Sequence, residues 1–592
     1  MLRLLLTSVV AAVVSAKCYE PTFAHPLPEY DVGDALPAHA FAELNTAITS
    51  AVAAPEFAAT SFSIAITSSK QTLWSKHHTA RERNASRPDI AEVNGDALYR
   101  IASITKTFTV LGVLYQEKAG NLSLDEPIDK YIVELKEAQN GTLPWKDITL
   151  RSLASQLSGI PREWAQGDLI NFEKWGVEDP VNWGLPPVSR QGLCICGEFS
   201  PNYKKICTES GEIHALLTNF ENALLTYSAV DLLDALKSKI PIFAPNQQST
   251  YSNAAFELLG MVLERVTGQS YRSFIEEAVF KPLNMSKSTL SLPPDSAGVI
   301  PLGPQYWDVD EGIQSPTGGI YSSSTDLSRY LRYVLTHFNG ITHALNWFNP
   351  ASPTRGLNSF YAVPWEIFHT DRALQNSRRT VRFITKGGGL PGYTSNIIIA
   401  PEYDLGITIL VAGNPELLPK LRESVTEFVR PAEQLAIRQL NERYAGTYVS
   451  SDSSLNSSVT IVADQRGLVV TEFISNSTDF LHVGIVNEWI PRYGIAQLVP
   501  TLLYRNAKKQ QGEEWRVQPV EQRDHQATHV WDDFCMTDIE GPLYAGVAIN
   551  NFVFWDKSED GGEYETLELS AFRANLTKVP RKRFLEEESM EL

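Results

Sequence analysis

The chain has 592 residues, of which 43% are hydrophobic and 20% are charged, as in an ordinary globular protein. This length exceeds what one hydrophobic core normally supports, so we expect two domains or one domain with large insertions. The 69 acidic residues outnumber the 51 basic ones, and the net charge is −18. Because that charge repels phosphate backbones and anionic lipid surfaces, the composition argues against nucleic acid as a partner.

The first 16 residues have the pattern of a secretory signal peptide. Arg3 is followed by an apolar run, and small residues precede the predicted cleavage point after Ala16. The alternative is a membrane anchor, but the run is shorter than the roughly 20 apolar residues that span a bilayer. No later stretch is long and apolar enough either. We therefore predict a secreted protein that has no membrane contact once residues 1–16 are removed.

Cysteines and sequons fit this secretory route. Five cysteines remain after cleavage, and in an oxidising compartment this odd number leaves at least one unpaired. Cys194-Ile195-Cys196 with Cys207 matches no standard zinc spacing, so we expect a disulfide-stapled loop and neither a metal nor a cofactor. The sequence does not assign the pairing among Cys18, Cys194, Cys196, Cys207 and Cys535. Seven sequons are candidates for glycosylation, at Asn84, Asn121, Asn140, Asn284, Asn456, Asn476 and Asn575.

Helix and strand patterns alternate along the first part of the chain. Apolar spacing predicts a helix over 37–54 and paired strands over 61–75. A short strand over 98–101 is expected to run directly into a helix over 103–119. Helical patterns then dominate as far as about Phe338.

Strand patterns return after this helical stretch, over 381–385, 393–400 and 404–412, and a helix follows that we expect to end before Pro431. The order of strands, helices, strands and closing helix predicts one sheet built from both ends of a domain. A helical lobe is inserted between the two sets of strands. We expect a crevice between the sheet and the lobe.

From about Leu435 the pattern changes to short β-like segments between Gly, Asn and Asp turns, which predicts a second, antiparallel β domain. These segments cover 458–463, 467–473, 498–504 and 546–554. The third contains Pro500, so we expect it to be an edge strand or to begin after that residue. The predicted division is a signal peptide over 1–16, a first domain over 17–434 with an insertion over 163–244, and a second domain over 435–592.

Ser103-Ile104-Thr105-Lys106 stands at the predicted junction of strand and helix. Residues three apart share a face of a helix, so the lysine amine can reach the serine hydroxyl. The serine also stands where backbone N–H groups converge at a helix N-terminus, which favours a developing negative charge. Taken alone, the pattern has a simpler interpretation as an N-cap serine beside a solvated lysine.

Two later elements favour a catalytic interpretation. Tyr251-Ser252-Asn253 opens a predicted helix over 254–267, and Lys386-Gly387-Gly388 ends a predicted strand. Ser-X-X-Lys, a Ser-Asp-Asn element and a Lys-Thr-Gly strand form the signature of β-lactamases and penicillin-binding proteins. Tyr-X-Asn is a form of the second element. Each later element alone would more simply be a buried aromatic residue or a surface lysine beside a glycine turn.

Five blocks of sequence resemble, in order, the family of class C β-lactamases, D-alanyl-D-alanine carboxypeptidases and esterases. The resemblance covers about residues 35–430, and the region beyond is more loosely similar to the β-rich extension of fungal secreted members. It implies an α/β (α+β) fold with an antiparallel sheet flanked by helices, a helical lobe and a C-terminal antiparallel β domain. The blocks are LYRIASITKTFTVLGVLYQEKAGNLSLDEPIDKYI, ITLRSLASQLSGIPR, FAPNQQSTYSNAAFELLGMVLERVTG, PTGGIYSSSTDLSRYL and KGGGLPGYTSN.

The resemblance implies catalytic roles that agree with the chemistry of the residues. Ser103 would attack the substrate carbonyl, Lys106 would accept its proton, and Tyr251 would relay a proton to the leaving group. For Lys106 to act as a base its pKa must fall to about 7–8, which a semi-buried site beside the cation of Lys386 would favour.

The same resemblance assigns Asn253, Lys386 and Gly388 to substrate binding, and the backbone N–H groups of Ser103 and Gly389 to an oxyanion hole. The sequence departs from the family at Gly387, where the family has a threonine whose hydroxyl helps to hold the carboxylate of lactams and peptides. This departure favours an ester or a specialised acyl donor over a β-lactam antibiotic.

The insertion over 163–244 is a second departure, with Trp164, Trp175 and Trp183 where the family places loops over the cleft. It either reshapes the substrate pocket or forms a peripheral loop.

These features predict a secreted serine hydrolase that acts on a small-molecule or peptide ester or amide through an acyl-Ser103 intermediate. Two alternatives remain. The same acyl-enzyme would pass its acyl group to an alcohol or amine in an acyltransferase that tailors secondary metabolites. A catalytically silent binding protein is the other, and the intact Ser103, Lys106 and Tyr251 argue against it.

Overall fold

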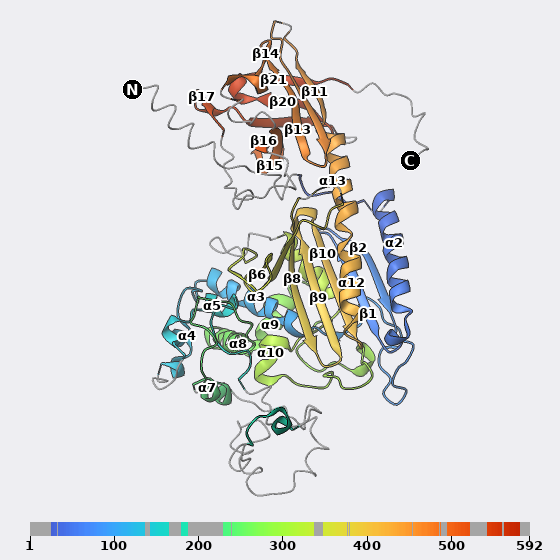
Figure 1. Ribbon diagram of the computed structural model, residues 1–592, viewed down its shortest axis with the longest axis vertical. Coiled ribbons are helices and arrows are strands. Elements are labelled where there is room, and N and C mark those ends of the chain that lie inside the picture. Colours follow the sequence, from blue (N-terminus) through green and yellow to red (C-terminus); the bar gives the residue numbers. More distant parts are fainter. Residues whose placement is uncertain are drawn as a thin grey trace. The chain divides into compact units, whose positions relative to one another are not determined.

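The computed structural model describes residues 25–31, 33–136, 143–164, 179–187, 229–237, 239–336, 347–375, 377, 379–452, 454–484, 486, 494–520, 541–558 and 562–580 (Figure 1). The chain forms two compact units. The first, called here the sheet-and-lobe unit, comprises Phe41–His369 and Phe383–Thr426. The second, the barrel unit, comprises Met1–Ala40, Thr370–Arg382 and Glu427–Leu592. The predicted signal peptide, the five cysteines, Asn140 and Trp175 lie outside the described residues.

An eight-stranded sheet forms the centre of the sheet-and-lobe unit, in the order β2-β1-β10-β9-β8-β7-β6-β5. β1 from the start of the unit pairs antiparallel with β10 from its end, with Ile64 opposite Ile409. This pairing confirms that both ends of the domain build one sheet. The strands are β1 (Ser61–Thr67), β2 (Thr72–His78), β5 (Ser352–Pro353), β6 (Ser359–Tyr361), β7 (Glu366–Thr370), β8 (Val381–Leu390), β9 (Tyr393–Ala400) and β10 (Leu405–Ala412).

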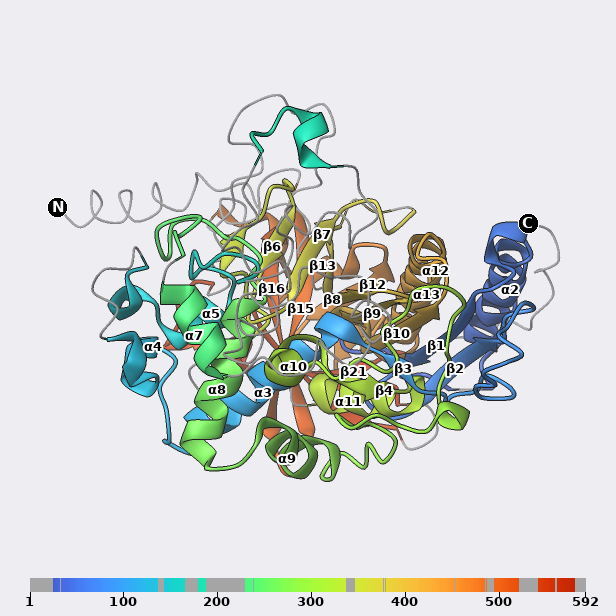
Figure 2. The same ribbon diagram turned by 90° about the horizontal axis from the view of Figure 1, so that it is seen from below.

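Helices cover both faces of this sheet, and for that reason every residue of β1 and β10 is buried. Figure 2 shows α11 (Ser324–Thr336) and α12 (Leu417–Thr426) on opposite faces of β10. At the edge of the sheet, Phe41 of α2 (Ala35–Val52) stacks on Trp74 of β2 with ring centroids 5.9 Å apart. Among the described helices, none is both long and apolar enough to cross a membrane.

The predicted helical lobe lies between β2 and β5 in the sequence. Its central helix α3 (Thr105–Lys118) is buried from Thr105 to Leu114. A Cβ atom on Gly112 would lie 2.8 Å from Phe274 of α9, so the absence of a side chain lets the two helices approach closely. The other elements are β3 (Tyr99–Arg100), β4 (Tyr321–Ser322), α4 (Ile128–Tyr131), α5 (Leu150–Ala154), α7 (Ala229–Lys237), α8 (Ala254–Thr267), α9 (Tyr271–Ile275) and α10 (Ser315–Gly318).

The expectation that the helix after β10 ends before Pro431 is confirmed, but an unpredicted helix follows it. α12 ends at Thr426, and a further helix, α13 (Val429–Arg443), carries Pro431 in its first turn. Proline is tolerated at this place because the first backbone N–H groups of a helix have no partner within the helix. The helical pattern therefore continues beyond Leu435, and the first β-strand of the barrel unit begins at Gly446.

The barrel unit confirms the predicted antiparallel β domain. Its sheet has the order β12-β11-β21-β20-β19-β16-β15-β13-β14, and an additional pairing of β12 with β13 closes it. Closure removes the exposed strand edges of an open sheet. The strands are β11 (Gly446–Ser450), β12 (Ser458–Asp464), β13 (Gly467–Ser475), β14 (Thr478–Asp479), β15 (Ile495–Asn506), β16 (Gln511–Val520), β19 (Asn551–Lys557), β20 (Tyr564–Leu569) and β21 (Ala574–Lys578), with β17 (Leu543–Tyr544) and β18 (Val547–Ala548) forming a separate hairpin.

The expectation that the strand with Pro500 is an edge strand or begins after this residue is wrong. β15 begins before Pro500 and lies between two other strands. Pairing with β13 reaches only Leu498, so Pro500 has no strand neighbour on that side. On the other side the register with β16 shifts between Pro500 and Leu503. A strand interior tolerates proline at such an irregularity, since no ladder hydrogen bond is lost.

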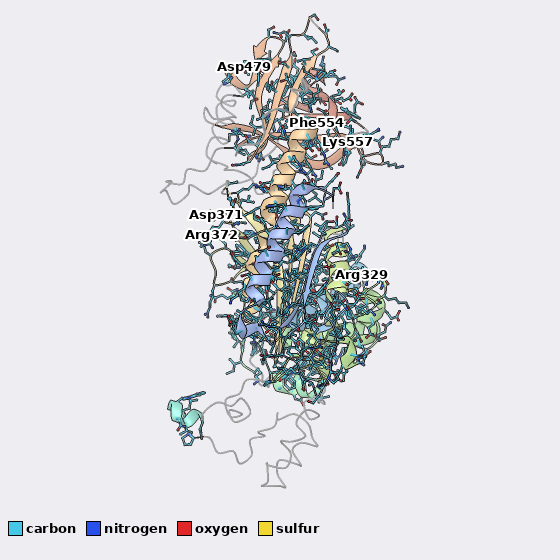
Figure 3. All side chains as sticks on the ribbon, turned by 90° about the vertical axis from the view of Figure 1, so that its right-hand side faces the viewer. Arg329, Asp371, Arg372, Asp479, Phe554 and Lys557 are labelled. Atoms are coloured by element: carbon cyan, nitrogen blue, oxygen red, sulfur yellow. The ribbon has the colours of Figure 1, made fainter. Side chains whose placement is uncertain are left out.

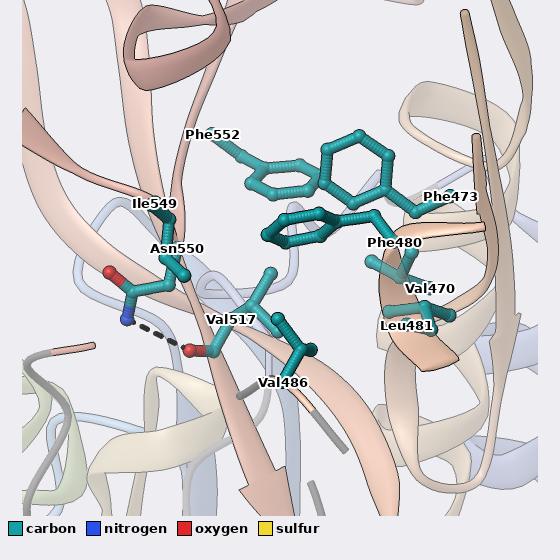
Figure 4. A pocket seen from close by; sticks show the side chains of 9 residues that line it. All are labelled: Val470, Phe473, Phe480, Leu481, Val486, Val517, Ile549, Asn550 and Phe552. Atoms are coloured by element: carbon teal, nitrogen blue, oxygen red, sulfur yellow. Dashed lines mark hydrogen bonds between the residues drawn. The ribbon is translucent and has the colours of Figure 1, made fainter. Parts of the chain in front are cut away.

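Aromatic side chains fill the inside of the barrel. On β19, Phe554 is buried whereas Lys557, three residues later, is exposed (Figure 3). A pocket within the unit is lined by Val470, Phe473, Phe480, Leu481, Val486, Val517, Ile549, Asn550 and Phe552 (Figure 4). The side chain of Asn550 donates a hydrogen bond to the Val517 carbonyl at 3.0 Å. The pocket therefore presents almost only apolar surface.

Trp515 is central to this core, and its removal tests the barrel. The side chain is fully buried, packs edge-on against Tyr444 at 4.9 Å and donates its indole N–H to Glu513 at 3.2 Å. Trp515→Ala leaves a cavity, so we expect it to lower the free energy of unfolding by about 3–5 kcal/mol. Urea unfolding followed by circular dichroism measures this loss.

Val449→Ala, at an exposed position on β11, is the control and should cost no more than about 0.5 kcal/mol. Equal unfolding curves for the two variants would contradict the proposed core.

Candidate active site

A tight turn brings Ser103 to the start of α3. β3 ends at Arg100, and Ala102 then takes a left-handed backbone conformation with φ 48°. This conformation costs a residue with a side chain about 1–2 kcal/mol. Two hydrogen bonds hold the turn, from the Ile101 N–H to the Ile320 carbonyl at 3.1 Å and from the Ser395 hydroxyl to the Ile101 carbonyl at 2.8 Å. Ser103 is thereby fixed, with its side chain only partly buried.

Lys106 lies one helical turn further on, and its side chain is completely buried. Its Nζ donates to Ser103 Oγ at 3.0 Å and to the Thr317 carbonyl at 3.0 Å. Burial lowers the pKa of the Lys106 amine, and the positive charge of Lys386 lowers it further, although Tyr251 opposes the shift. Because burial makes its charged form less stable than that of an ordinary lysine, Lys106 is suited to exchange a proton with Ser103.

Tyr251 reaches the same serine from the helical lobe. Its hydroxyl donates to Ser103 Oγ at 2.9 Å. Burial alone would raise the pKa of this phenol, but the positive charges of Lys106 and Lys386 outweigh it and lower the pKa to about 8. The segment is held by the backbone N–H of Ser252, which donates to Gln156 Oε1 at 2.7 Å. Tyr251 can therefore exchange a proton near neutral pH.

Lys386 lies on β8 and is buried, with its Nζ 5.3 Å from the centre of the Tyr251 ring. It donates to Glu366 Oε1 at 2.6 Å and to the Gly387 carbonyl at 2.8 Å. Burial alone would lower the pKa of Lys386, but the negative charge of Glu366 outweighs it and raises the pKa. Lys386 therefore stays positively charged, whereas Lys106 is driven towards neutrality.

The glycines that follow Lys386 let β8 pass close to the serine turn. A Cβ atom on Gly388 would lie 2.4 Å from the Ile101 carbonyl oxygen and 2.5 Å from Ser395 Oγ, so no side chain fits there. A Cβ atom on Gly389 would meet nothing within 4 Å. The structure thus brings β8 against the turn that presents Ser103. The oxyanion hole of the Ser103 and Gly389 N–H groups stays a prediction.

Asn253, which was expected to bind substrate, precedes α8 and binds a carboxyl group of the protein. Its side-chain amide donates to Glu163 Oε1 at 2.5 Å, while its buried Oδ1 has no hydrogen-bond partner among the described residues. The structure places Asn253 beside Tyr251 in the chain but shows no contact with Ser103. Its role in substrate binding stays a prediction.

Sequence reasoning missed three carboxyl groups of the site, those of Glu163, Glu257 and Glu366. Burial raises the pKa of Glu163, although Asn253 and Arg162 oppose it. Burial also raises the pKa of Glu257 well above its usual value, with a further contribution from Glu163. Glu257 stands four residues after Asn253, so a helical projection could have found it on the same face of α8. No sequence pattern pointed to Glu366.

The two ends of the predicted insertion lie side by side at this site. Backbone hydrogen bonds run from Ile242 to the Gly159 carbonyl at 2.8 Å and from Asn253 to the Arg162 carbonyl at 2.8 Å. The segments that precede and follow the insertion therefore both lie near Tyr251. Of the tryptophans in this insertion, Trp164 is buried and Trp183 is exposed.

Direct titration of Tyr251 tests this electrostatic description. The phenol should ionise near pH 8, about two units below an ordinary tyrosine, because two positive charges stabilise the phenolate. Burial raises the pKa of other tyrosines, such as Tyr99 and Tyr330. A pH titration that follows the near-ultraviolet absorbance of phenolate should therefore resolve an early step that disappears in Tyr251→Phe.

Tyr544→Phe, which removes an exposed tyrosine of the barrel unit, should retain the early step. An early step that survives in Tyr251→Phe would show that another group is responsible.

Comparisons with known proteins agree with this geometry. Residues 51–428 match the family model described as Beta-lactamase, and residues 436–580 match "Beta-lactamase-like-like, C-terminal domain". The chain is 30% identical over 542 residues to "Probable hydrolase M10" of Phoma sp., covering 88% of this chain and 85% of that protein. It is 28% identical over 546 residues to the "Beta-lactamase-like protein" of Arthroderma benhamiae, covering 86% of each.

Among solved structures, a class C β-lactamase is similar at a TM-score of 0.45 and 16% identity, over 67% of this chain and 96% of that one. The family match spans more than half of the residues and contains Ser103, Lys106, Tyr251 and Lys386. The resemblance seen in the sequence motifs is confirmed: the chain belongs to the β-lactamase family and carries the C-terminal domain of β-lactamase-like proteins.

Proposed function

We propose that this chain is a serine hydrolase that cleaves an ester or amide through an acyl-enzyme on Ser103. One observation carries the proposal: Ser103 Oγ accepts hydrogen bonds from both Lys106 at 3.0 Å and Tyr251 at 2.9 Å. A serine that only capped a helix would need neither contact. Membership of the β-lactamase family and the relative named as a hydrolase support the same reaction class.

In the acylation step, Ser103 Oγ attacks the substrate carbonyl while Lys106 accepts the hydroxyl proton. The Thr317 carbonyl orients the amine of Lys106 towards the serine. Negative charge develops on the carbonyl oxygen, where we assign the N–H groups of Ser103 and Gly389 as donors. Losing one such donor typically lowers the rate by about 10²–10³.

Departure of the alcohol or amine requires a proton, which Tyr251 is placed to deliver. Its pKa of about 8 means that both the phenol and the phenolate are populated near neutral pH. In the deacylation step, water attacks the acyl carbon and gives its proton to the Tyr251 phenolate, while Lys106 returns its proton to Ser103 Oγ as the acyl bond breaks. Acyl transfer follows the same steps with an alcohol or amine in place of water.

Covalent labelling tests the acyl-enzyme directly. A fluorophosphonate probe should add to the full-length protein once, with the mass increase located on the peptide that contains Ser103. Ser103→Ala should abolish labelling because the nucleophile is gone, and Lys106→Met should slow it by about 10²–10⁴ because the base is gone.

Ser454→Ala, which removes an exposed serine of the barrel unit, should label at the parental rate. Equal labelling of Ser103→Ala and the parent would reject the assignment. The ratio of hydrolysis to transfer when an alcohol is added then separates a hydrolase from an acyltransferase.

We also propose that the protein is secreted and N-glycosylated, with a disulfide-stapled loop at Cys194, Cys196 and Cys207. Exposure of the sequons supports the proposal, because the six candidate asparagines within the described residues are all exposed. These are Asn84, Asn121, Asn284, Asn456, Asn476 and Asn575. Glycan transfer requires such access to the side-chain amide.

Expression in a fungal secretory host tests this route. The protein should appear in the medium with Lys17 as its first residue, and enzymatic removal of N-glycans should lower its mass. A variant lacking residues 1–16 is the control and should stay inside the cell. Retention of the complete chain, with no change in mass after glycosidase treatment, would contradict the proposal.

A further inference from the structure

The ion pair between Lys386 and Glu366 joins a buried cation to a more accessible anion. Lys386 Nζ lies 2.6 Å from Glu366 Oε1, and the side chains are 2% and 33% exposed respectively. Glu366 stands at the start of β7, and Lys386 lies on β8 next to it in the sheet. A group that approaches Lys386 from solvent therefore comes near the Glu366 carboxylate.

The second oxygen of Glu366 uses another donor at the same place. Glu366 Oε2 accepts a hydrogen bond from the Gly387 N–H at 3.1 Å. It also lies 3.7 Å from the point where a Cβ atom on residue 387 would stand. Residue 387 has no hydroxyl to offer, since it is glycine. One carboxylate of the protein thus accepts hydrogen bonds from both the Lys386 ammonium and the Gly387 backbone N–H.

The nearby Arg162 is likewise paired. Its guanidinium lies 5.0 Å from the centre of the Tyr251 ring, and its Nε lies 3.3 Å from Glu163 Oε1. Among the described residues next to Tyr251, both Arg162 and Lys386 therefore have a carboxylate partner, and the amine of Lys106 is completely buried and donates to Ser103 and to the Thr317 carbonyl. An anion that approaches either Arg162 or Lys386 therefore meets a carboxylate already beside that cation.

We propose that Glu366 is a specificity-determining residue that restricts the site to acyl donors with no carboxylate close to the scissile bond, such as neutral esters, lactones and amides. The inference rests on the proposed acylation of Ser103. Glu366 acts by occupying Lys386 and by repelling a second negative charge. Like charges brought together across a binding surface reduce binding strongly, so we expect discrimination of about tenfold or more.

A matched pair of probes tests the proposal without knowledge of the natural substrate. The two fluorophosphonates share one alkyl chain and differ only in carrying a carboxylate or a carboxamide two carbons from phosphorus. The second-order rate of Ser103 labelling is measured for both with the full-length protein. The carboxamide probe should react at least about tenfold faster with the parent protein.

Glu366→Gln keeps the size of the side chain and an oxygen that accepts from Lys386, but it removes the negative charge. This variant should reduce the preference to less than about threefold, mainly through faster labelling by the carboxylate probe. Glu423→Gln removes an exposed glutamate from α12 of the same unit and should leave the parental preference unchanged. The preference is the ratio of the two rates in one variant, so it does not depend on the overall labelling rate, and a circular dichroism spectrum equal to that of the parent shows that Glu366→Gln is folded.

Three outcomes would overturn the inference. Equal labelling of the parent by both probes excludes charge selection, even if Glu366→Gln fails to fold. An unchanged preference in a folded Glu366→Gln assigns the selection to other residues. Failure of both probes, with Ser103→Ala behaving as the parent, rejects the acyl-enzyme itself and is distinguishable from the first two.

Discussion

The hydrogen bond from the Lys106 amine to Ser103 joins the first turn of α3 to the short turn that precedes it, and the surrounding unit keeps the amine buried. Removing an amine from water penalises its charged form, so burial and catalysis are linked. Three contacts maintain this state: the Thr317 carbonyl accepts the second hydrogen bond, Phe256 lies 5.4 Å from the amine, and Gly388 lets the sheet approach the serine turn. A change in any of them alters the proton affinity of the base.

The pKa values of the two buried lysines of this site, Lys106 and Lys386, shift in opposite directions because the groups beside them differ. Both lose hydration, which lowers the pKa of a lysine, but Lys386 is hydrogen-bonded to a carboxylate, whose charge outweighs the loss. Glu366 keeps Lys386 charged, while Lys106 contacts a hydroxyl and a carbonyl and is driven towards its neutral form. When the environment shifts the pKa values of two similar groups in opposite directions, the two groups commonly have different roles in catalysis. The charges of Lys106 and Lys386 also lower the pKa of Tyr251, whose ring centre lies 5.1 Å from the first amine and 5.3 Å from the second.

Much of the fold and the centre of the site could be predicted from the sequence because both rest on local spacing. Ser103 and Lys106 stand three residues apart, and a helix brings them together whatever surrounds it. The strand, helix and strand order likewise required that β1 and β10 meet in one sheet. The family motifs then located Tyr251 and Lys386, which no local spacing connects.

The features that were missed depend on contacts between distant segments. Glu366 pairs with a lysine twenty residues later on the neighbouring strand, and no motif surrounds it. Gly388 is needed because the Ile101 carbonyl lies in the way of any side chain. The wrong expectation for Pro500 and the unpredicted helix α13 have the same origin, since Pro431 is permitted by its place in a first turn and Pro500 by a gap in strand pairing. Propensity alone records neither circumstance.

The measurement that tests this account most directly is the pKa of Lys106 in the folded protein. Lysine side chains labelled with ¹³C at Cε can be followed by NMR across a pH titration, with Lys106→Met assigning the signal. The account predicts that this amine titrates below the ordinary lysine value of 10.5, because burial disfavours its charge. Titration of Lys106 at or above the ordinary value would contradict its role as the base that activates Ser103.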